Sequence, residues 1–555
     1  MSVDFILFFL SYFIILTSIL GYGLLFYGSL KRIKNFNFGY IGLIGIFFLI
    51  LYSYLSNIFI SHSEIHNLLF LTIGFIYFII FTKKFYNKIK KEILFTIIIF
   101  TILFSSALIF KNHDDFPYYH FPYTFYLTQQ SAVFGVGQFN HGFRTPSSIF
   151  YINSLFYLPM VKYYLFNFSA LYILGFSNII LLKKIHNFFN NFEFNKNLNK
   201  NINYINYLSL LVFAFINIFF YRIGEHGTDR SAQILIFILV IFILEYFYIK
   251  KINKIDLIFI YTLLGLIISL KAFYILYLLL IFPLFLFILK KKNNFLLTVI
   301  YFINNKFFIF FVLLLILVLV SYFFNTGCFI YPLSITCFES LSWGLSLDVV
   351  EKMNNWYQLW SKAGANPNYR VANPDQYILK FNWVSNWLSS YFFNKVSDFI
   401  LGLIFMILVF FVIFINPKNL KNKIKLDKYS ILTFLILLIL LTEWFYNHPA
   451  LRYGGYCLIA LIFFIPTSLY LSLFKIDSKK LTNSIFILVL LTSIIFLGRN
   501  IHRINKEINV YNYMPLKQTF YKIDNHYFRI QKQIENIDDS KIKKIFGKKV
   551  FIVNK

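Results

Sequence analysis

Two adjacent aspartates follow an apolar segment in the stretch KNHDDFPYYHF, which runs from Lys111 to Phe121. A carboxylate that is partly removed from water can act as a general base or bind a divalent cation. Helix capping alone would explain one aspartate at such a position, but it explains a pair less well. We therefore take Asp114 and Asp115 as the candidate catalytic residues, with Mg²⁺ or Mn²⁺ as a candidate cofactor bound by the same pair.

Further ionisable side chains are concentrated in a few short stretches. GEHGTDR holds four of them within six residues, Glu225 to Arg230, which is more than a plain turn requires. Arg452 in HPALRYGGY has the planar guanidinium that suits bidentate binding of phosphate. Lys271 stands in an otherwise uncharged stretch, where it could bind a lipid phosphate or simply extend to the surface. The candidate substrate-binding residues are His113, His120, His141, Arg144, Glu225, His226, Asp229, Arg230, Lys271, Glu443, His448 and Arg452.

The elements that must position these residues are membrane-spanning helices. The chain is 59% hydrophobic and only 14% charged, which is too apolar for a soluble globular protein. Apolar runs long enough to cross a bilayer recur along the chain, and the sequence predicts about 14 such helices. They include segments near 67–82, 93–110, 204–222, 231–249 and 256–270. We expect an all-α polytopic membrane protein, with interfacial helices in the first large outer loop, where Pro117 and Pro122 suit helix starts.

The basic residues indicate how the chain is oriented. The formal net charge of +29 could suggest nucleic acid, but Lys and Arg form short clusters in every second loop between apolar runs. This distribution follows the positive-inside rule and predicts no nucleic-acid partner. It predicts an outer N-terminus, and it brings the ionisable motifs to the periplasmic face of a bacterial inner membrane.

Three parts can be distinguished along the chain. Residues 1–92 form an N-terminal segment of three helices, and residues 93–498 form the catalytic membrane domain, with outer loops at 111–166 and 325–394. Residues 499–555 form a small basic C-terminal segment.

The longest outer loop carries two cysteines nine residues apart, Cys328 and Cys337. They could form a disulfide, as expected in an oxidising compartment, or they could be two small buried apolar side chains. The surrounding Gly and Pro suit a tight loop and favour the disulfide. The same loop is rich in Trp, Asn and Tyr, a composition that fits carbohydrate contact or an aromatic belt at the membrane interface.

An acidic motif after a spanning helix, an interfacial helix behind it and cations at the outer ends of later helices resemble the GT-C superfamily of polyprenyl-phosphate-dependent glycosyltransferases. The residues that carry the resemblance are Asp114 and Asp115 in HDDFPYYHF, with GEHGTDRSAQ and HPALRYGGY in support, and it covers roughly residues 93–500. Unlike the usual member, this chain has three predicted spanning segments before the one that leads into the motif.

The resemblance implies transfer of a sugar from a lipid-phosphate donor to an acceptor on the outer face, commonly with inversion. Asp114 or Asp115 would take the proton of the acceptor hydroxyl. Four cations would hold the donor phosphate, namely Arg144, Arg230, Lys271 and Arg452, and His113, Glu225 or Asp229 would orient the acceptor or complete a metal site. The acceptor could be a lipid, a polysaccharide or a protein.

Three other functions are compatible with the same features. A polysaccharide polymerase or ligase also uses lipid-linked donors, although it generally lacks an early pair of aspartates. A flippase would move lipid-linked sugars across the bilayer without an acceptor. A membrane scaffold would have no catalytic activity at all.

Overall fold

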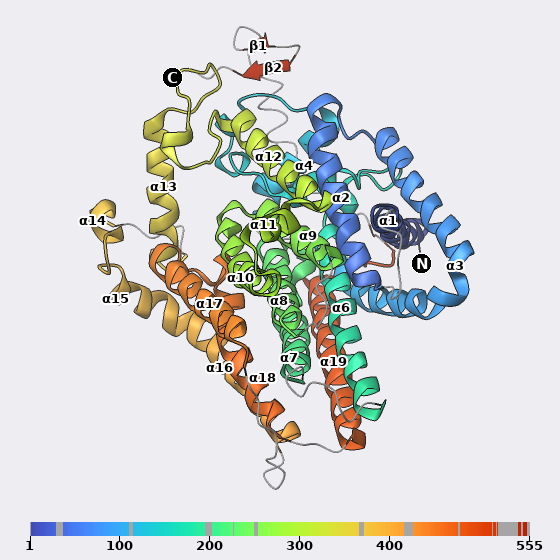
Figure 1. Cartoon of the computed structure of the whole chain (residues 1–555). Coiled ribbons are helices and arrows are strands. Elements are labelled where there is room, and N and C mark those ends of the chain that lie inside the picture. The colour runs from blue at the N-terminus through green and yellow to red at the C-terminus, as the bar shows by residue number, and fades with distance from the viewer. Residues whose placement is uncertain are drawn as a thin grey trace.

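The computed structural model describes residues 2–28, 37–109, 115–194, 203–225, 227–248, 254–365, 371–415, 426–474, 478–512, 514–517, 519, 542–545 and 548–551. In this part of the chain the fold is all-α, apart from one short antiparallel pair of strands, β1 (Ile542–Ile545) and β2 (Lys548–Phe551) (Figure 1). The helices are α1 (Val3–Gly28), α2 (Phe38–Phe59), α3 (Glu64–Ala107), α4 (Phe121–Gln129), α5 (Ser148–Ser154), α6 (Phe168–Phe194), α7 (Asn203–Phe219), α8 (Thr228–Tyr246), α9 (Lys254–Leu270), α10 (Ile281–Lys292), α11 (Phe295–Ile303), α12 (Lys306–Thr326), α13 (Leu347–Lys362), α14 (Pro374–Ile378), α15 (Val384–Trp387), α16 (Ser397–Phe414), α17 (Lys428–Asn447), α18 (Gly455–Ser472) and α19 (Ser478–Tyr511).

Ten stretches among the described residues are helical, long and apolar enough to cross a membrane. They comprise α1, α2, α3, α6, the run from Ala272 through α10, α12, the run from α15 through α16, α17, α18 and α19. The chain is therefore a multi-pass membrane protein, as predicted from its composition.

The count of ten is lower than the predicted number of about 14 for two reasons. The predicted segments 67–82 and 93–110 belong to one helix, α3, which is kinked at Phe85. The predicted segments 204–222, 231–249 and 256–270 form α7, α8 and α9. α7 and α9 have 17 residues each, and α8 carries Asp229, Arg230 and Glu245.

Helices α7, α8 and α9 lie in the centre of the fold. This position explains why α7 and α9 are shorter than the spanning helices and why α8 can carry charged residues. Residues 231–241 of α8 are buried without interruption, and α7 and α9 are buried along most of their length. Such helices contact other helices rather than lipid, so they need less hydrophobic length than a lipid-exposed helix.

The three N-terminal helices pack closely together and share one hydrophobic core with the rest of the chain. A Cβ atom added at Gly21 of α1 would lie 1.8 Å from the carbonyl oxygen of Gly74 in α3. Only glycine permits this approach of the two backbones. Helix α2 in turn packs against α6, α9 and α12, so the N-terminal segment supports the helices that carry the ionisable motifs (Figure 1).

The loop after α3, which the sequence predicted to face outward, forms short helices, as Pro117 and Pro122 predicted. From Asp115 onward it contains the π-helical turn Phe116–His120, followed by α4, and Pro117 and Pro122 lie in their first turns. Residues 121–128 of α4 are all buried, and α4 packs on α5. The predicted interfacial helix is therefore enclosed by protein along most of its length.

The final spanning helix is longer than the sequence indicated. The apolar run ends near residue 498, but α19 continues to Tyr511 and so brings charged residues of the predicted C-terminal segment into the helical body. The remainder of that segment contains the β1–β2 pair, in which Ile542 is opposite Phe551.

Candidate functional site

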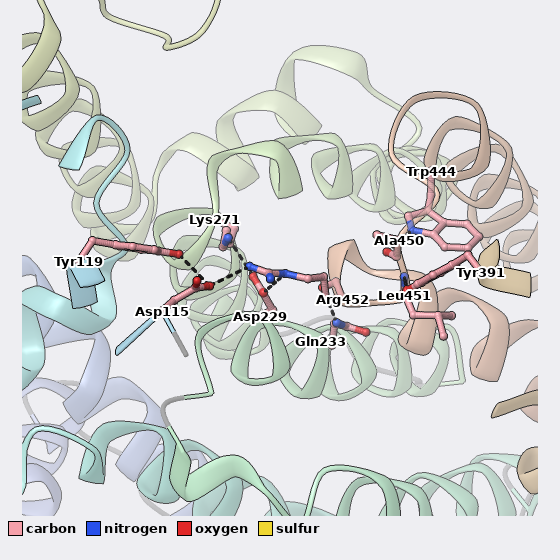
Figure 2. A network of polar contacts seen from close by, with 10 residues as sticks. All are labelled: Asp115, Tyr119, Asp229, Gln233, Lys271, Tyr391, Trp444, Ala450, Leu451 and Arg452. Atoms are coloured by element: carbon pink, nitrogen blue, oxygen red, sulfur yellow. Dashed lines mark hydrogen bonds and ion pairs between the residues drawn. The ribbon is translucent and has the colours of Figure 1, made fainter. Parts of the chain in front are cut away.

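Four elements that are distant in sequence bring ionisable side chains to one place (Figure 2). Asp115 directly precedes the Phe116–His120 turn, and Asp229 lies in the first turn of α8. Lys271 directly follows α9, and Arg452 lies in the short turn between α17 and α18. All four positions are helix ends or loops, where the chain can present polar groups at the end of an apolar helix.

Arg452 links the two aspartates. Its Nη2 lies 3.6 Å from Oδ2 of Asp115, and its Nε donates a hydrogen bond of 3.2 Å to Oδ2 of Asp229. Nζ of Lys271 lies 3.0 Å from Oδ1 of Asp229. The hydroxyl of Tyr119 donates a hydrogen bond of 3.3 Å to Oδ2 of Asp115. We call these five residues the Arg452 network, and they hold two carboxylates and two cations side by side (Figure 2).

The backbone around Arg452 is fixed by side chains from neighbouring helices. Nε2 of the buried Gln233 in α8 donates to the carbonyl oxygen of Arg452 at 2.9 Å. Its Oε1 accepts from the backbone N–H of Cys457 at 3.0 Å. The Tyr391 hydroxyl accepts from the N–H of Leu451 at 3.0 Å. These hydrogen bonds restrain the backbone on both sides of Arg452, while Asp115 and Asp229 hold its guanidinium.

Aromatic rings cover the cations of the network. The guanidinium of Arg452 lies 5.2 Å from the ring centre of Trp360 and 5.4 Å from that of Tyr453. Burial favours a lower pKa for Arg452, but Tyr453, Asp229, Tyr119 and Asp115 outweigh it and raise the pKa above its usual value. Arg452 is therefore a permanent cation.

The network forms part of the wall of a cavity that has a volume of about 630 Å³, including its opening to solvent. The lining residues are Asp115, His120, Arg222, Glu225, Gly227, Thr228, Asp229, Arg230, Gln233, Arg452 and Tyr456. Arg230 lies in this wall, and no described residue forms an ion pair with it. The wall of the cavity thus combines the carboxylates of Asp115 and Asp229 with the guanidinium groups of Arg230 and Arg452.

Glu225 is held by two arginines that the sequence did not single out. Arg222 makes a bidentate contact, with Nε 2.9 Å from Oε1 and Nη2 2.7 Å from Oε2 of Glu225. Arg503 of α19 pairs with the same carboxylate, which is only 4% exposed. Arg222 could have been suspected because it is three residues before Glu225. Arg503 could not, because it lies in the segment assigned to the C-terminal tail.

The other predicted binding residues have different surroundings. Arg144 is committed to protein contacts, since its Nε donates to the Gly137 carbonyl at 3.1 Å and its Nη1 to the Tyr331 hydroxyl at 2.9 Å. Glu443 accepts a hydrogen bond of 3.0 Å from Asn447, and no described residue connects it to the Arg452 network. His120 lines the cavity.

Two predicted histidines lie against aromatic rings beside the network. The ring of His141 lies among Tyr118, Tyr119 and Trp356, and burial, together with Arg144, lowers the pKa of His141. The ring of His448 faces Tyr453, and burial followed by the charge of Lys362 lowers the pKa of His448 to about 4. Both side chains are therefore neutral near pH 7.

Three predicted residues, His113, Asp114 and His226, lie outside the described residues. Within the part of the chain that the structure describes, no three His, Cys, Asp or Glu side chains form a group that could hold a metal ion. The two aspartates of the Arg452 network are instead joined through an arginine.

Cys328 and Cys337 are joined in a disulfide, and Cys457 is a free, buried cysteine within α18. The structure thus contains the predicted disulfide rather than two separate buried cysteines. It closes a short loop directly after α12.

Comparison with known proteins assigns the chain to a family. It is an all-α, multi-pass membrane protein, and its residues 5–459 match the family described as "Domain of unknown function (DUF8201)". Since the match covers most of the chain, the protein belongs to this family. No curated protein and no solved structure shows significant similarity to it.

Proposed function

We propose that this protein is a glycosyltransferase of the GT-C type. It would move a sugar from a polyprenyl-phosphate-linked donor to a cell-envelope acceptor, at the periplasmic face of a bacterial inner membrane. The observation that carries the proposal is the position of Asp115, which follows a spanning helix and lies 3.6 Å from the Arg452 guanidinium in the wall of a charged cavity. This combination provides a base and a cation for a leaving anion at one site.

The proposed reaction needs no covalent intermediate. The carboxylate of Asp115, or of its neighbour Asp114, takes the proton of the acceptor hydroxyl while the hydroxyl oxygen attacks the anomeric carbon. The new carbon–oxygen bond forms as the bond from that carbon to the phosphate oxygen breaks, and the phosphate leaves with the electron pair. Attack opposite to the leaving phosphate inverts the anomeric configuration.

Lys271, Arg452 and Arg230 differ in how much charge they can offer to the phosphate. Asp229 already neutralises much of the charge of Lys271 and Arg452, because it contacts both. Arg230 forms no ion pair with a described residue and lines the same cavity, so its guanidinium can pair with the phosphate at the lowest cost. We therefore assign the main phosphate contact to Arg230, with Arg452 between the phosphate and the base.

The experiment that tests the proposal compares two aspartate variants in the living cell and in lipid vesicles. Asp115→Asn removes the candidate base of the Arg452 network but keeps the side-chain shape, whereas Asp348→Asn changes an exposed aspartate on α13 that pairs with Lys352. Mass spectrometry of envelope glycans and of polyprenyl-linked sugars should show a missing sugar and accumulated donor for Asp115→Asn, and an unchanged profile for Asp348→Asn.

Two outcomes would contradict the proposal. An unchanged glycan profile after deletion of the whole chain would exclude a transferase of envelope sugars. Movement of a lipid-linked sugar across vesicles without any acceptor, at the same rate in the Asp115→Asn variant, would identify a flippase instead.

A further inference from the structure

The loop from Cys328 to Cys337 exposes an unusual set of apolar side chains. Ile335 is 86% exposed, and four neighbours are also exposed: Phe329, Ile330, Leu333 and Phe338. The sequence NTGCFIYPLSITCF contains no charged residue. A loop in contact with water rarely presents so continuous an apolar surface, and such surfaces usually mark contact with a partner or a membrane.

The shape of this loop is fixed, so its apolar side chains do not simply collapse onto the protein. The disulfide closes the loop at both ends. Inside it, the backbone N–H of Phe329 donates to the Thr336 carbonyl at 3.2 Å, and that of Leu333 donates to the Ile330 carbonyl at 2.8 Å. The apolar surface is therefore presented by a closed and hydrogen-bonded structure.

The exposed surface continues that of a spanning helix. The ring of Phe329 stacks on Phe323 in the last turns of α12 at 4.7 Å, and Phe338 meets the same ring edge-on at 6.1 Å. Along α12 itself, Ile309 and Ile316 are exposed, as expected for side chains that face lipid. The apolar surface of the loop is thus continuous with the lipid-facing surface of α12.

The opposite side of the loop is attached to the first outer loop. Tyr331, which is buried, accepts the hydrogen bond from Arg144 in the first outer loop. Asn325, at the end of α12, donates to the Phe143 carbonyl of the same outer loop at 2.8 Å. The first outer loop also carries Asp115, so the disulfide loop connects the membrane side of the fold with the segment that holds the candidate base.

We propose that the Cys328–Cys337 loop inserts its apolar side chains into the membrane leaflet at the Thr326 end of α12. The partner is the lipid surface at the boundary between headgroups and acyl chains, where aromatic and aliphatic side chains gain most from leaving water. This contact fixes the height of the first outer loop above the bilayer. The proposal rests on the exposed apolar side chains of the loop, on its closed shape and on its continuity with the surface of α12. It does not depend on the reaction that the candidate site performs.

The test places a fluorescent reporter on the loop. Ile335→Trp adds a tryptophan at its most exposed position, and Glu351→Trp adds one at an exposed position of α13. In nanodiscs made with brominated acyl chains, the emission added by Ile335→Trp should be strongly quenched, relative to plain lipids and to the unchanged chain. The emission added by Glu351→Trp should be retained. Retained emission for Ile335→Trp, or equal quenching of both variants, would overturn the proposal.

A second measurement separates lipid from protein partners. A benzophenone-bearing residue introduced in place of Leu333 should form adducts with lipid on illumination of native membranes. Adducts with a second copy of the chain, or with another protein in place of lipid, would show that the loop is a protein interface and would overturn the proposal.

Discussion

Nη2 of Arg452 and Oδ2 of Asp115 lie 3.6 Å apart, although Arg452 belongs to the last turn before α18 and Asp115 directly precedes the Phe116–His120 turn. Both side chains remain about one third exposed. An ion pair in such surroundings contributes little to stability, since solvent screens it. The contact is therefore better explained by a role in the cavity, where it brings a carboxylate beside a guanidinium, than by a contribution to the stability of the fold.

This relationship predicts a separation of activity and stability. Asp115→Asn should reduce the proposed sugar transfer by about 10²-fold or more, because it removes the proposed general base, while the free energy of unfolding changes by less than about 1 kcal/mol. Initial rates and thermal unfolding in detergent measure the two effects. Equal loss of both for Asp115→Asn would indicate a structural role for this carboxylate.

Substitution of Glu225 should instead lower the stability of the fold. Glu225→Gln leaves Arg222 and Arg503 without their shared carboxylate in a buried position, which should cost about 3 kcal/mol. Because Arg503 belongs to α19, limited proteolysis should cut that helix more readily in the variant. Glu351→Gln, an exposed change of the same type on α13, serves as the control and should leave both readouts unchanged.

The low pKa of His448 predicts that the folded protein loses stability in mild acid. Its pKa in the folded state is about 4, against about 6.5 in the unfolded chain, since burial and then Lys362 disfavour the charged ring. Between pH 6.5 and pH 4 the unfolded chain therefore binds more protons at His448 than the folded protein does. The contribution of neutral His448 to the free energy of unfolding is complete above pH 6.5 and falls as the pH drops toward 4.

The measurement is thermal unfolding at several pH values between pH 7.5 and pH 4.5. His448→Gln cannot take up a proton, so it should show a smaller decline toward acid pH than the unchanged chain. His502→Gln, at an exposed position in α19, should decline as the unchanged chain does. An identical decline in all three proteins would rule out His448 as the titrating group.

The disulfide predicts a defined pattern of thiol labelling. In the native protein without reductant, a maleimide should label no cysteine, because Cys457 is buried and the other two are bonded. The double variant Cys328→Ser, Cys337→Ser should unfold more easily by about 2 to 3 kcal/mol, as expected for loss of a short closed loop. Labelling of Cys328 in untreated membranes would contradict the disulfide in the cell.

The sequence alone was enough to identify a helical, multi-pass membrane protein and to locate nearly all of its long helices. Hydrophobic length is a local property, so each apolar run could be recognised without its neighbours. Local chemistry also pointed to Asp115, Asp229, Lys271 and Arg452, because charged groups beside apolar helices are costly unless they are paired or functional.

Only the tertiary structure decided which of these groups meet. Glu225 and Asp229 are four residues apart, yet one is enclosed by Arg222 and Arg503 and the other joins Lys271 and Arg452. Arg144 has the same chemistry as Arg452, but it contacts Tyr331 outside the Arg452 network. An ion pair depends on distances between helix ends that are far apart in the chain, and packing of the central helices α7, α8 and α9 sets those distances.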